Sequence, residues 1–533
     1  MRAERRGLVA LILVAGLGWA GGAAPIGPAS VAAADDAPAA RALALGPAGL
    51  PEQRTTLELA PGVSLTRIRH GAADPASAWT VTAAWQEADA AAQADLGRLA
   101  GAGFNASVVP IGQRAPDDAA PGPLGYAVRV GSFATRAPAD RLLRDVRAAG
   151  FADAGVDYTG EDGGPTTGPW AVAVLRIDHA QFRGRLGNIL ASSTISAGRA
   201  PVSQAAPRAG ALAGVNGGYF VVGPSDGTPG DPAGISVVDG QLVAEAVNGR
   251  TALFLGPTTG HGEPLAQILS GVSTAIDATA SDGAERVVNG LDRVPGRVRA
   301  CGRPGAQPTQ GPKHDFTCTD PDELVVYKPL FGSATPAGSG VEAALDADGL
   351  VTVLRPRGGR IPPTGTVLAG TGAASDWLTA HAQPGARVMV TERLTADGQR
   401  RLLRPGLGVV NGGPRLVRDG HTEIPACAEG FCYPETGRFY WRFGVRRNPR
   451  TMVGVTPEGD ALLVAVDGHE PDHSVGLSFL EAADVMRALG SSQAINVDGG
   501  GSTTMVSGGQ VVNVPSDATG ERPVGDAIVV LPR

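Results

Sequence analysis

The pattern of hydrophobic positions divides the chain into an apolar leader, a region of alternating strands and helices, and a long strand-rich region. Gly7 to Ala20 is apolar and follows three arginines within the first six residues, and residues 32–34 are all alanine. This pattern is typical of a secretory signal peptide, so we assign residues 1–34 to one, with an uncleaved anchor as the alternative. We expect no membrane span after cleavage and an extracytoplasmic location, secreted or in the cell envelope.

Residues 76–160 contain a weak internal duplication. Each half reads as an alternating strand, an amphipathic helix ended by glycine, and a short strand, first from Trp79 to Phe104 and then from Tyr126 to Phe151. We therefore predict a small βαβ-βαβ domain with one open sheet face. Residues 161–169 predict a linker. We expect the segment 35–75 to pack on the C-terminal domain through a strand near residues 60–68.

The second half of the duplication carries Tyr126-Ala127-Val128-Arg129-Val130-Gly131-Ser132-Phe133. This stretch resembles the SPOR repeat domain. The resemblance implies that the domain binds peptidoglycan glycan strands, with Arg129 and Ser132 of the open sheet face contacting sugar. The alternative is a folded spacer whose aromatic side chains are simply core.

The region 170–533 predicts one large, mixed-sheet α+β domain in which three polar stretches interrupt buried strands. The first is Asn216-Gly217-Gly218-Tyr219-Phe220, echoed at residues 411–413, where paired glycines permit positive φ and close approach of a ligand. The second joins residues 448–454 to an apolar strand that ends at Asp467-Gly468. A helix is predicted at residues 474–489.

The third stretch covers residues 494–505. A buried strand presents Asn496 and Asp498 on one face, and three glycines and three hydroxyl residues follow. Successive amides in a glycine-rich turn form a concave anion site. No Gly-Lys-Ser/Thr follows, so the stretch is not a P-loop.

Composition narrows the class of protein. The chain has 533 residues with 77 glycines and 42 prolines, which favours turn-rich β or α/β structure over long helical bundles. Its net charge of −7 argues against nucleic-acid binding. Four cysteines allow three pairings, and we favour the two local ones, Cys301 with Cys318 and Cys427 with Cys432. Zinc binding is the rival interpretation, but an oxidising compartment favours disulfides.

Taken together, these motifs resemble the phosphodiester glycosidase family. The resemblance rests on N-G-G-Y-F, N-P-R-T-M-V-G, the D-G after a buried strand, S-x-G-L-S-x-x-E, N-x-D-G-G-G-S-T-T-M and the tail containing Glu521-Arg522-Pro523. It implies hydrolysis of a sugar-1-phosphodiester, such as one of N-acetylglucosamine, in envelope or extracellular polysaccharide. The chain departs from the family at His469, where arginine is frequent.

The resemblance and the demands of the reaction suggest roles for particular residues. A carboxylate must stabilise or attack an oxocarbenium-like centre, and Asp498 is the first choice, Glu481 the second. Asp467 is a third candidate, which would otherwise orient Arg450 or bind a metal. The expected substrate-binding residues are Asn216, Gly217, Arg450, Thr451, His469, Asn496, Gly499, Gly500, Gly501, Ser502 and Thr503.

Two questions stay open at this point. We assign no cofactor, although a divalent metal is an alternative because acids lie beside glycine loops; the tightest histidine cluster is His469 with His473. The second hypothesis on function is a non-catalytic wall- or exopolysaccharide-binding protein that keeps the glycosidase fold. The expected partners are peptidoglycan glycan strands and phosphodiester-linked envelope sugars.

Overall fold

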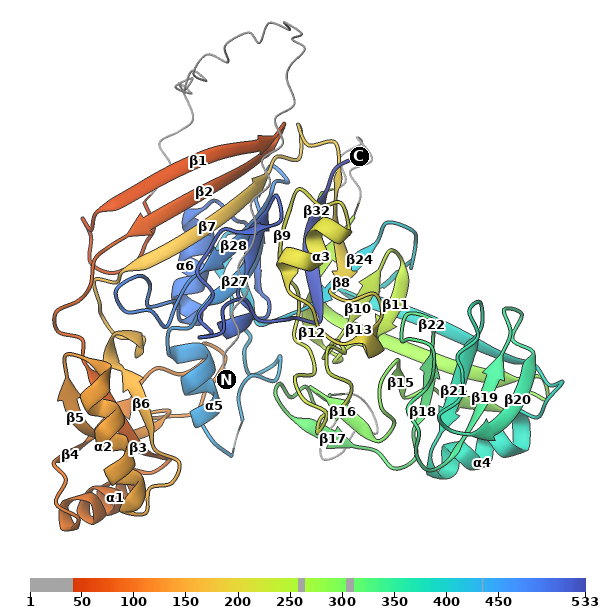
Figure 1. The fold of residues 1–533 in the computed structure, drawn as a ribbon, viewed down its shortest axis with the longest axis horizontal. Coiled ribbons are helices and arrows are strands. Elements are labelled where there is room, and N and C mark those ends of the chain that lie inside the picture. The colour runs from red at the N-terminus through yellow and green to blue at the C-terminus, as the bar shows by residue number, and fades with distance from the viewer. Residues whose placement is uncertain (1–41, 257–263, 303–310, 434) are drawn as a thin grey trace, which may run out of the picture. The chain divides into compact units, whose positions relative to one another are not determined.

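The structure is a computed structural model that describes residues 42–256, 264–302, 311–433 and 435–533 (Figure 1). The predicted signal peptide, residues 1–34, lies outside these ranges. The fold is mixed and sheet-rich, as predicted in outline, and its strands form several separate sheets. Within the described ranges, no helix combines the length and the apolar character needed to cross a bilayer.

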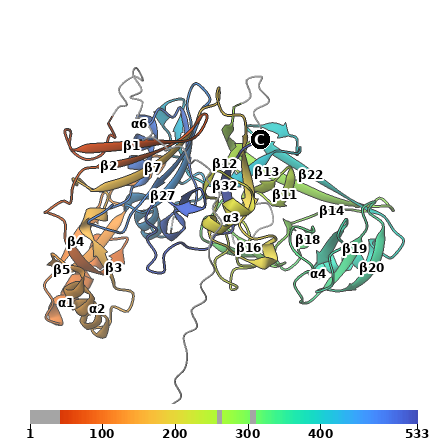
Figure 2. The same cartoon turned by 45° about the horizontal axis from the view of Figure 1, so that its top comes forward.

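The N-terminal duplication forms a four-stranded sheet of order β4-β5-β3-β6 with two helices (Figure 2). Both predicted strand–helix–strand halves are confirmed, and this β-α-β-β-α-β order is that of ferredoxin-like domains. One sheet face packs on the helices through Val81, Val128 and Val130. The elements are β3 (Trp79–Gln86), α1 (Asp89–Gly101), β4 (Ala106–Ile111), β5 (Gly125–Phe133), α2 (Arg136–Ala148) and β6 (Gly155–Tyr158).

The opposite face of this small sheet is not open, which corrects the sequence-based expectation. Trp85 stacks on Trp441 of the large region with ring centroids 4.8 Å apart. Arg129 is only 8% exposed and donates two hydrogen bonds to Asp162. Apolar side chains on this face need a cover, which the large region supplies, and only Ser132 of the two expected sugar contacts is exposed.

The segment after β6 is held by arginines of the large region. Arg446 forms ion pairs with Glu161 and Asp162, and Arg447 donates to the carbonyl of Gly160 at 2.7 Å. Both arginines are buried. The start of the predicted linker is therefore part of a packed and charged interface.

The central sheet of the large region has eight antiparallel strands in the order β1-β2-β7-β28-β27-β29-β25-β26 (Figure 1). The strand expected near residues 60–68 is present as β2 and pairs with β7 from Val63↔Ile177 to His70↔Trp170. The strands are β1 (Glu52–Ala60), β2 (Val63–His70), β7 (Trp170–Ile177), β25 (Arg415–Arg418), β26 (His421–Thr422), β27 (Arg450–Val455), β28 (Ala461–Val466) and β29 (Gln493–Asn496).

A second sheet, of order β31-β30-β9-β32-β8, carries the residues that become important below. In it Asn216 of β9 pairs with Ala527 of β32. Its elements are β8 (Arg185–Leu190), β9 (Ala213–Asn216), β30 (Met505–Ser507), β31 (Gln510–Val511) and β32 (Asp526–Leu531), with helix α3 (Val202–Arg208) packed beside them.

Two further sheets and a hairpin complete the large region. One sheet has the order β11-β10-β24-β12-β13-β22-β23 with β14 on β13, and the other β15-β18-β21-β19-β20. Helix α4 (Gly372–His381) packs on the latter. The strands are β10 (Ser236–Val238), β11 (Gln241–Ala244), β12 (Arg250–Leu255), β13 (Ala266–Ala280), β14 (Glu285–Val287), β15 (Gly290–Leu291), β16 (Arg297–Arg299), β17 (Thr317–Thr319), β18 (Leu324–Tyr327), β19 (Val341–Leu345), β20 (Val351–Pro356), β21 (Thr366–Gly370), β22 (Val388–Ala396), β23 (Gln399–Arg401) and β24 (Gly408–Asn411).

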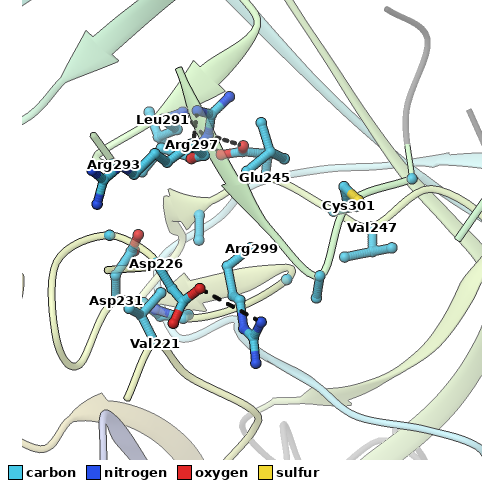
Figure 3. A pocket seen from close by; sticks show the side chains of 18 residues that line it. Val221, Asp226, Asp231, Glu245, Val247, Leu291, Arg293, Arg297, Arg299 and Cys301 are labelled. Atoms are coloured by element: carbon cyan, nitrogen blue, oxygen red, sulfur yellow. Dashed lines mark hydrogen bonds and ion pairs between the residues drawn. The ribbon is translucent and has the colours of Figure 1, made fainter. Parts of the chain in front are cut away.

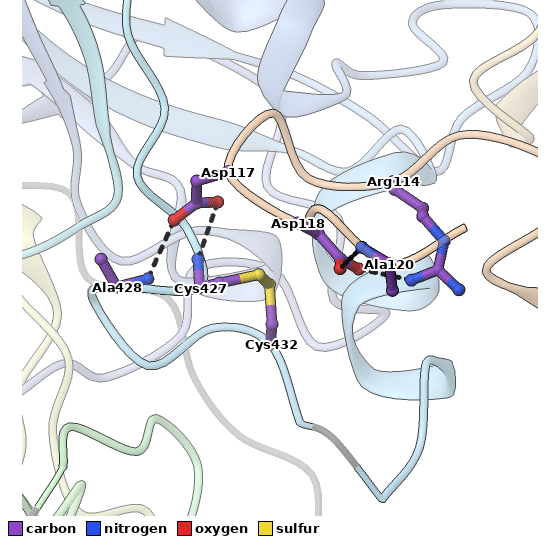
Figure 4. The surroundings of a disulfide bond; sticks show 7 residues. All are labelled: Arg114, Asp117, Asp118, Ala120, Cys427, Ala428 and Cys432. Carbon is purple, nitrogen blue, oxygen red and sulfur yellow. Dashed lines mark hydrogen bonds and ion pairs between the residues drawn. A yellow bond between two sulfur atoms is a disulfide. The ribbon is translucent and has the colours of Figure 1, made fainter. Parts of the chain in front are cut away.

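Both predicted disulfides, Cys301–Cys318 and Cys427–Cys432, are formed. The carboxylate of Asp117, in the connection between the two halves of the small domain, accepts the amides of Cys427 and Ala428 at 3.0 and 2.9 Å (Figure 4). The small domain therefore fixes the loop that the second disulfide closes.

The helix expected at residues 474–489 is shorter than predicted. It is α6, Phe479–Ala488, and it begins after Ser478 in a capping box with Glu481. Leu477 pairs instead with Asn448 as an isolated bridge. The short helix α5 (Arg438–Tyr440) continues into a π-helical turn, Trp441–Val445, that leads toward β27.

Candidate active site

Asn216 joins three segments that are far apart in the sequence. Its side-chain amide donates to the carbonyl of Asp498 at 2.8 Å, and its oxygen accepts from Thr451 Oγ1 at 2.6 Å and from the Thr504 amide at 3.1 Å. Asn216 and Thr451 are fully buried. The side chains of these two predicted binding residues therefore hold the segments of the site together and do not offer free groups to a ligand.

Asp498 lies at the end of β29, where sequence analysis placed it. Its residue surface is partly exposed, yet its carboxyl group is surrounded by protein, and this burial raises the pKa of Asp498 to about 6. The Gly499 amide donates to Oδ1 at 2.9 Å and favours the charged form. The Ser502 hydroxyl also lowers the pKa of Asp498, although no hydrogen bond of good geometry joins the two.

Asp526, at the start of β32, is a second buried carboxyl group that sequence analysis missed. It is 1% exposed, and burial together with the charge of Asp498 raises the pKa of Asp526 to about 7. Its Oδ1 accepts the Gly218 amide at 2.8 Å. A carboxylate that begins a buried strand was visible in the sequence, but its place beside Asp498 depends on the sheet pairing.

Gly217 connects the two acids. Its carbonyl accepts the Asp498 amide at 3.2 Å, and its own amide donates to the Asp526 carbonyl at 2.9 Å. A Cβ on Gly217 would lie 2.2 Å from Oδ1 of Asp526. The glycine predicted to permit close approach thus does so, and the group that approaches is Asp526.

Arg522 is the arginine beside Asp498. It forms two 2.7 Å hydrogen bonds with Asp517, and the charges of Asp517 and Asp498 raise its pKa. A Cβ on Gly501 would lie 2.1 Å from an Arg522 nitrogen, so this glycine leaves space for the guanidinium. Arg522 remains about one-third exposed and is therefore open to an anion.

The amides of the glycine turn are used differently from the expectation. The Gly499 amide bonds to Asp498, and the Gly500 amide donates to the carbonyl of Pro449 at 2.9 Å. Two of the three amides expected to bind an anion are therefore committed within the protein. The turn instead shapes the surroundings of Asp498 and Arg522.

Five buried polar atoms near the two acids have no hydrogen-bond partner among the described protein atoms. Buried polar groups are nearly always paired in proteins, by protein or by water. Their concentration around one pair of acids therefore indicates a place where a polar ligand or water binds. These atoms are Asn496 Oδ1, Ser502 Oγ, Thr503 Oγ1, Thr504 Oγ1 and Asp526 Oδ2.

Tyr219 is a buried aromatic residue that is hydrogen-bonded to Asn496 of β29. Its hydroxyl donates to the Gly413 carbonyl at 2.6 Å and accepts from Asn496 Nδ2 at 2.9 Å. Its ring meets the edge of the His314 ring at a centroid distance of 4.2 Å. Burial and the Asp498 charge raise the pKa of Tyr219, so the phenol stays protonated.

Arg450, the predicted phosphate ligand, is only 1% exposed. Nε donates to the Leu477 carbonyl at 2.9 Å, and another guanidinium nitrogen donates to the Phe443 carbonyl. The guanidinium also lies over the Phe479 ring, 4.3 Å from its centroid. These contacts make Arg450 a core residue that ties α6 to the π-helical turn.

Glu481 also has a structural role. It caps α6 by accepting the Ser478 amide at 2.9 Å, and it forms an ion pair with Arg447 at 2.6 Å. The structure therefore does not bring Glu481 to the acid pair.

Asp467 has a partner for each carboxylate oxygen. Oδ1 accepts from Asn513 Nδ2 and the Val514 amide, and Oδ2 lies 2.7 Å from Nε2 of His473. His469 lies 3.1 Å from Glu161, at the start of the predicted linker, instead of joining His473. Asp467 thus orders the loop beside Thr503 and is not in contact with Arg450.

A cluster of metal-ligand type lies at the second disulfide. In the described ranges, the one cluster of metal-ligand type is Asp117 with Cys427 and Cys432. Both cysteines are in a disulfide, and Asp117 accepts two amides there (Figure 4). The capping of the loop accounts for this cluster.

Comparison with known proteins identifies the type of domain. Residues 339–531 match the family model of phosphodiester glycosidase. N-acetylglucosamine-1-phosphodiester alpha-N-acetylglucosaminidase from Mus musculus is 33% identical over 142 residues, 26% of this chain and 27% of that protein. The chain thus matches about a quarter of the length of its curated relatives.

Two crystal structures resemble most of the chain. A protein from Burkholderia pseudomallei K96243, provisionally described as exported, is 39% identical with a TM-score of 0.86, and the match covers 92% of this chain and 98% of that one. A hypothetical protein from Synechocystis shares the fold at 18% identity and a TM-score of 0.52, with 91% and 80% covered.

The matched domain is thus of the phosphodiester glycosidase type, and it contains Asp498, Arg522 and Asp526. The chain belongs to the same family as the Burkholderia pseudomallei protein. The matched range begins after Asn216 and Tyr219, which reach the acids through the sheet that β9 shares with β32.

Proposed function

We propose that the chain is an exported glycosidase that hydrolyses sugar-1-phosphodiesters, such as those of N-acetylglucosamine, in envelope or extracellular polysaccharide. The observation that supports this proposal most strongly is the buried pair Asp498 and Asp526 beside the accessible Arg522. The relatives' activity and the exported description of the Burkholderia protein support the reaction and the location.

The two acids divide the chemistry according to their environments. Asp498 has the lower pKa, about 6, and is largely ionised near pH 7, where it stabilises or attacks the oxocarbenium-like anomeric carbon. Asp526, with a pKa of about 7, still holds its proton in a large fraction of molecules and exchanges it with the departing oxygen or the incoming water.

Arg522 supplies the charge that the leaving group requires. A phosphodiester carries one negative charge before cleavage and gains another when the bond to the anomeric carbon breaks. Asp517 holds the guanidinium in place through two hydrogen bonds. The unpartnered oxygens of Thr503, Thr504 and Asn496 then bind sugar hydroxyl or acetamido groups.

The test is hydrolysis of methyl N-acetylglucosamine-1-phosphate and related sugar-1-phosphodiesters by the purified chain, with product analysis. We expect release of the free sugar by the wild type and at least a 1000-fold loss in Asp498→Asn. Absence of turnover across the substrates, together with binding of the same compounds, would favour the alternative of a non-catalytic polysaccharide-binding protein.

Peptidoglycan glycan strands are the proposed partner of the small domain. The covered sheet face limits this proposal to the exposed C-terminal end of β5, which carries Ser132, because Arg129 is bound to Asp162. Co-sedimentation with peptidoglycan tests the proposal, as developed below.

A further inference from the structure

The segment Thr503–Met505 carries two of the unpartnered hydroxyl groups near the acids and is held by two asparagines. Asn216 accepts the Thr504 amide through Oδ1 and donates its own amide to the Thr504 carbonyl, both at 3.1 Å. Asn513 accepts the Met505 amide through Oδ1 at 2.8 Å and donates Nδ2 to the Thr503 carbonyl at 3.1 Å. The backbone of all three residues is therefore fixed, and with it the point from which each threonine side chain starts.

Asp467 sets the orientation of the Asn513 carboxamide. Oδ1 of this carboxylate accepts Asn513 Nδ2 at 2.9 Å and the Val514 amide at 3.0 Å. Because a carboxylate only accepts and an NH2 group only donates, Nδ2 must face Asp467 and the Thr503 carbonyl, which leaves Oδ1 for the Met505 amide. Asp467 is 4% exposed, so water competes little for these hydrogen bonds.

His473 connects Asp467 to the surface of the protein. Its Nε2 lies 2.7 Å from Oδ2 of Asp467, and its Nδ1 lies 2.8 Å from a guanidinium nitrogen of Arg69 on β2. A guanidinium group only donates, so Nδ1 accepts and the ring proton is on Nε2, which donates to Asp467. Arg69 is exposed. A chain of four hydrogen-bonded side chains, the last of them Asn513, thus runs from a surface strand to the buried threonine segment.

This chain of hydrogen bonds ends at the threonines and not at the acids. Asp498 and Asp526 are held separately, through the amide and the carbonyl of Gly217. A change at Asn513 should therefore alter how the substrate is bound more than how its bond is broken.

We infer that Asn513, held by Asp467 and His473, is a positioning residue that sets the Thr503 and Thr504 hydroxyl groups for binding of the sugar. The inference rests on the proposed function and deepens it, because it names the part of the site that recognises the sugar rather than the phosphodiester.

Binding and turnover of the full chain, measured separately, test this inference. In Asn513→Ala, the Kd of free N-acetylglucosamine from ligand-observed NMR and the KM for methyl N-acetylglucosamine-1-phosphate should each rise about tenfold, with kcat within about threefold of the wild type. Equal Kd values in the two proteins, a fall in kcat at constant KM, or no binding of the free sugar by the wild type would overturn the inference. If the variant binds the sugar more weakly but the wild type cleaves no phosphodiester, the proposed function fails and the positioning role stands.

Two variants of His473 distinguish positioning from a general loss of stability. His473→Gln keeps an amide that can donate to Asp467 and should keep the wild-type Kd for N-acetylglucosamine. His473→Leu has no donor and should raise this Kd about fivefold. Equal Kd values in the two variants would overturn the inference.

Asp467→Asn has a matched control at Asp226. The new NH2 group would face a donor, either Asn513 Nδ2 or His473 Nε2, so the Kd for N-acetylglucosamine should rise about tenfold. Asp226 accepts the Thr317 hydroxyl at 2.6 Å and lies 3.9 Å from Arg299, in a small pocket that Asp467 and Asn513 do not line (Figure 3). Asp226→Asn should keep the wild-type Kd, and a rise as large as in Asp467→Asn would overturn the inference.

Discussion

Replacing Asp526 by asparagine separates the cost of burying this carboxyl group from its role in the reaction. The side chain is 1% exposed, and asparagine keeps an oxygen that can accept the Gly218 amide. The substitution removes the titration and changes the shape of the residue very little. Stability and activity should therefore change in opposite directions.

The size of the expected change in the free energy of unfolding follows from the pKa of Asp526. The folded-state pKa of about 7 lies above the ordinary value of 3.8, so the folded state binds the proton more tightly than the unfolded state does. The resulting stability is complete below about pH 4 and is lost as the pH rises through 7. The difference of about 3 pKa units corresponds to about 4 kcal/mol at 1.36 kcal/mol per unit.

Guanidinium unfolding at a series of pH values provides the assay. Between pH 4 and pH 8, the stability of Asp526→Asn relative to the wild type should rise by about 4 kcal/mol, whereas its kcat should fall by a factor of about 10² to 10⁴. Asp348→Asn, in an exposed loop, should follow the wild type. Parallel stability curves for wild type and Asp526→Asn would refute the reasoning, because they would show that burial does not perturb this carboxyl group.

Three further predictions concern the remaining candidates. Arg522→Lys should raise KM about tenfold with little loss of stability, because lysine cannot make the two-pronged contact. Arg450→Met should instead lower the free energy of unfolding by about 2 kcal/mol or more, because it leaves buried carbonyl groups unpaired. The reverse pattern in kinetics and denaturant unfolding would contradict the roles given to these two arginines. Glu481→Ala should lower the free energy of unfolding by about 3 to 5 kcal/mol, because it removes one half of the capping box and leaves the buried charge of Arg447 without its carboxylate. The folded fraction should keep its kcat, and a loss of about 1000-fold would restore Glu481 as a catalytic candidate. If the intact chain co-sediments with amidase-treated peptidoglycan, Arg129 should not mediate the binding. Pelleting should therefore be unchanged in Arg129→Ala and reduced in Ser132→Trp. Loss of pelleting in Arg129→Ala, with the small domain still folded, would show that the covered face binds glycan.

The sequence predicted local structure well where one segment carried its own signal. The two strand–helix–strand halves, the strand ending at Asp467 and both disulfides follow from periodicity, glycine stops and cysteine spacing. Helix α6 began later than predicted because Ser478 and Glu481 form a capping box, which ended the apparent periodicity at Leu477.

The candidate site was only partly predictable. In the sequence, Asp498 follows a buried strand and precedes a run of three glycines, and this pattern marked it as a candidate. The structure places it beside a second buried acid. Asp526 gave no local signal beyond an acid at the start of a strand, because its position depends on long-range pairing of β32 with β9. Arg450 looked like an anion ligand because arginine commonly binds phosphate, and its burial against Phe479 could not be read from spacing.

The prediction that one face of the small sheet is open was wrong for a similar reason. Alternation in β5 predicts one covered and one free face, but it cannot show that a distant segment covers the second. Trp441 does so by stacking on Trp85, and Arg446 neutralises the acids that follow β6.

Product analysis with a defined sugar-1-phosphodiester tests the central claim most directly. With methyl N-acetylglucosamine-1-phosphate, the account predicts free N-acetylglucosamine and methyl phosphate in equal amounts from the wild type, and neither product above background from Asp498→Asn. Turnover by Asp498→Asn at the wild-type rate would contradict the account.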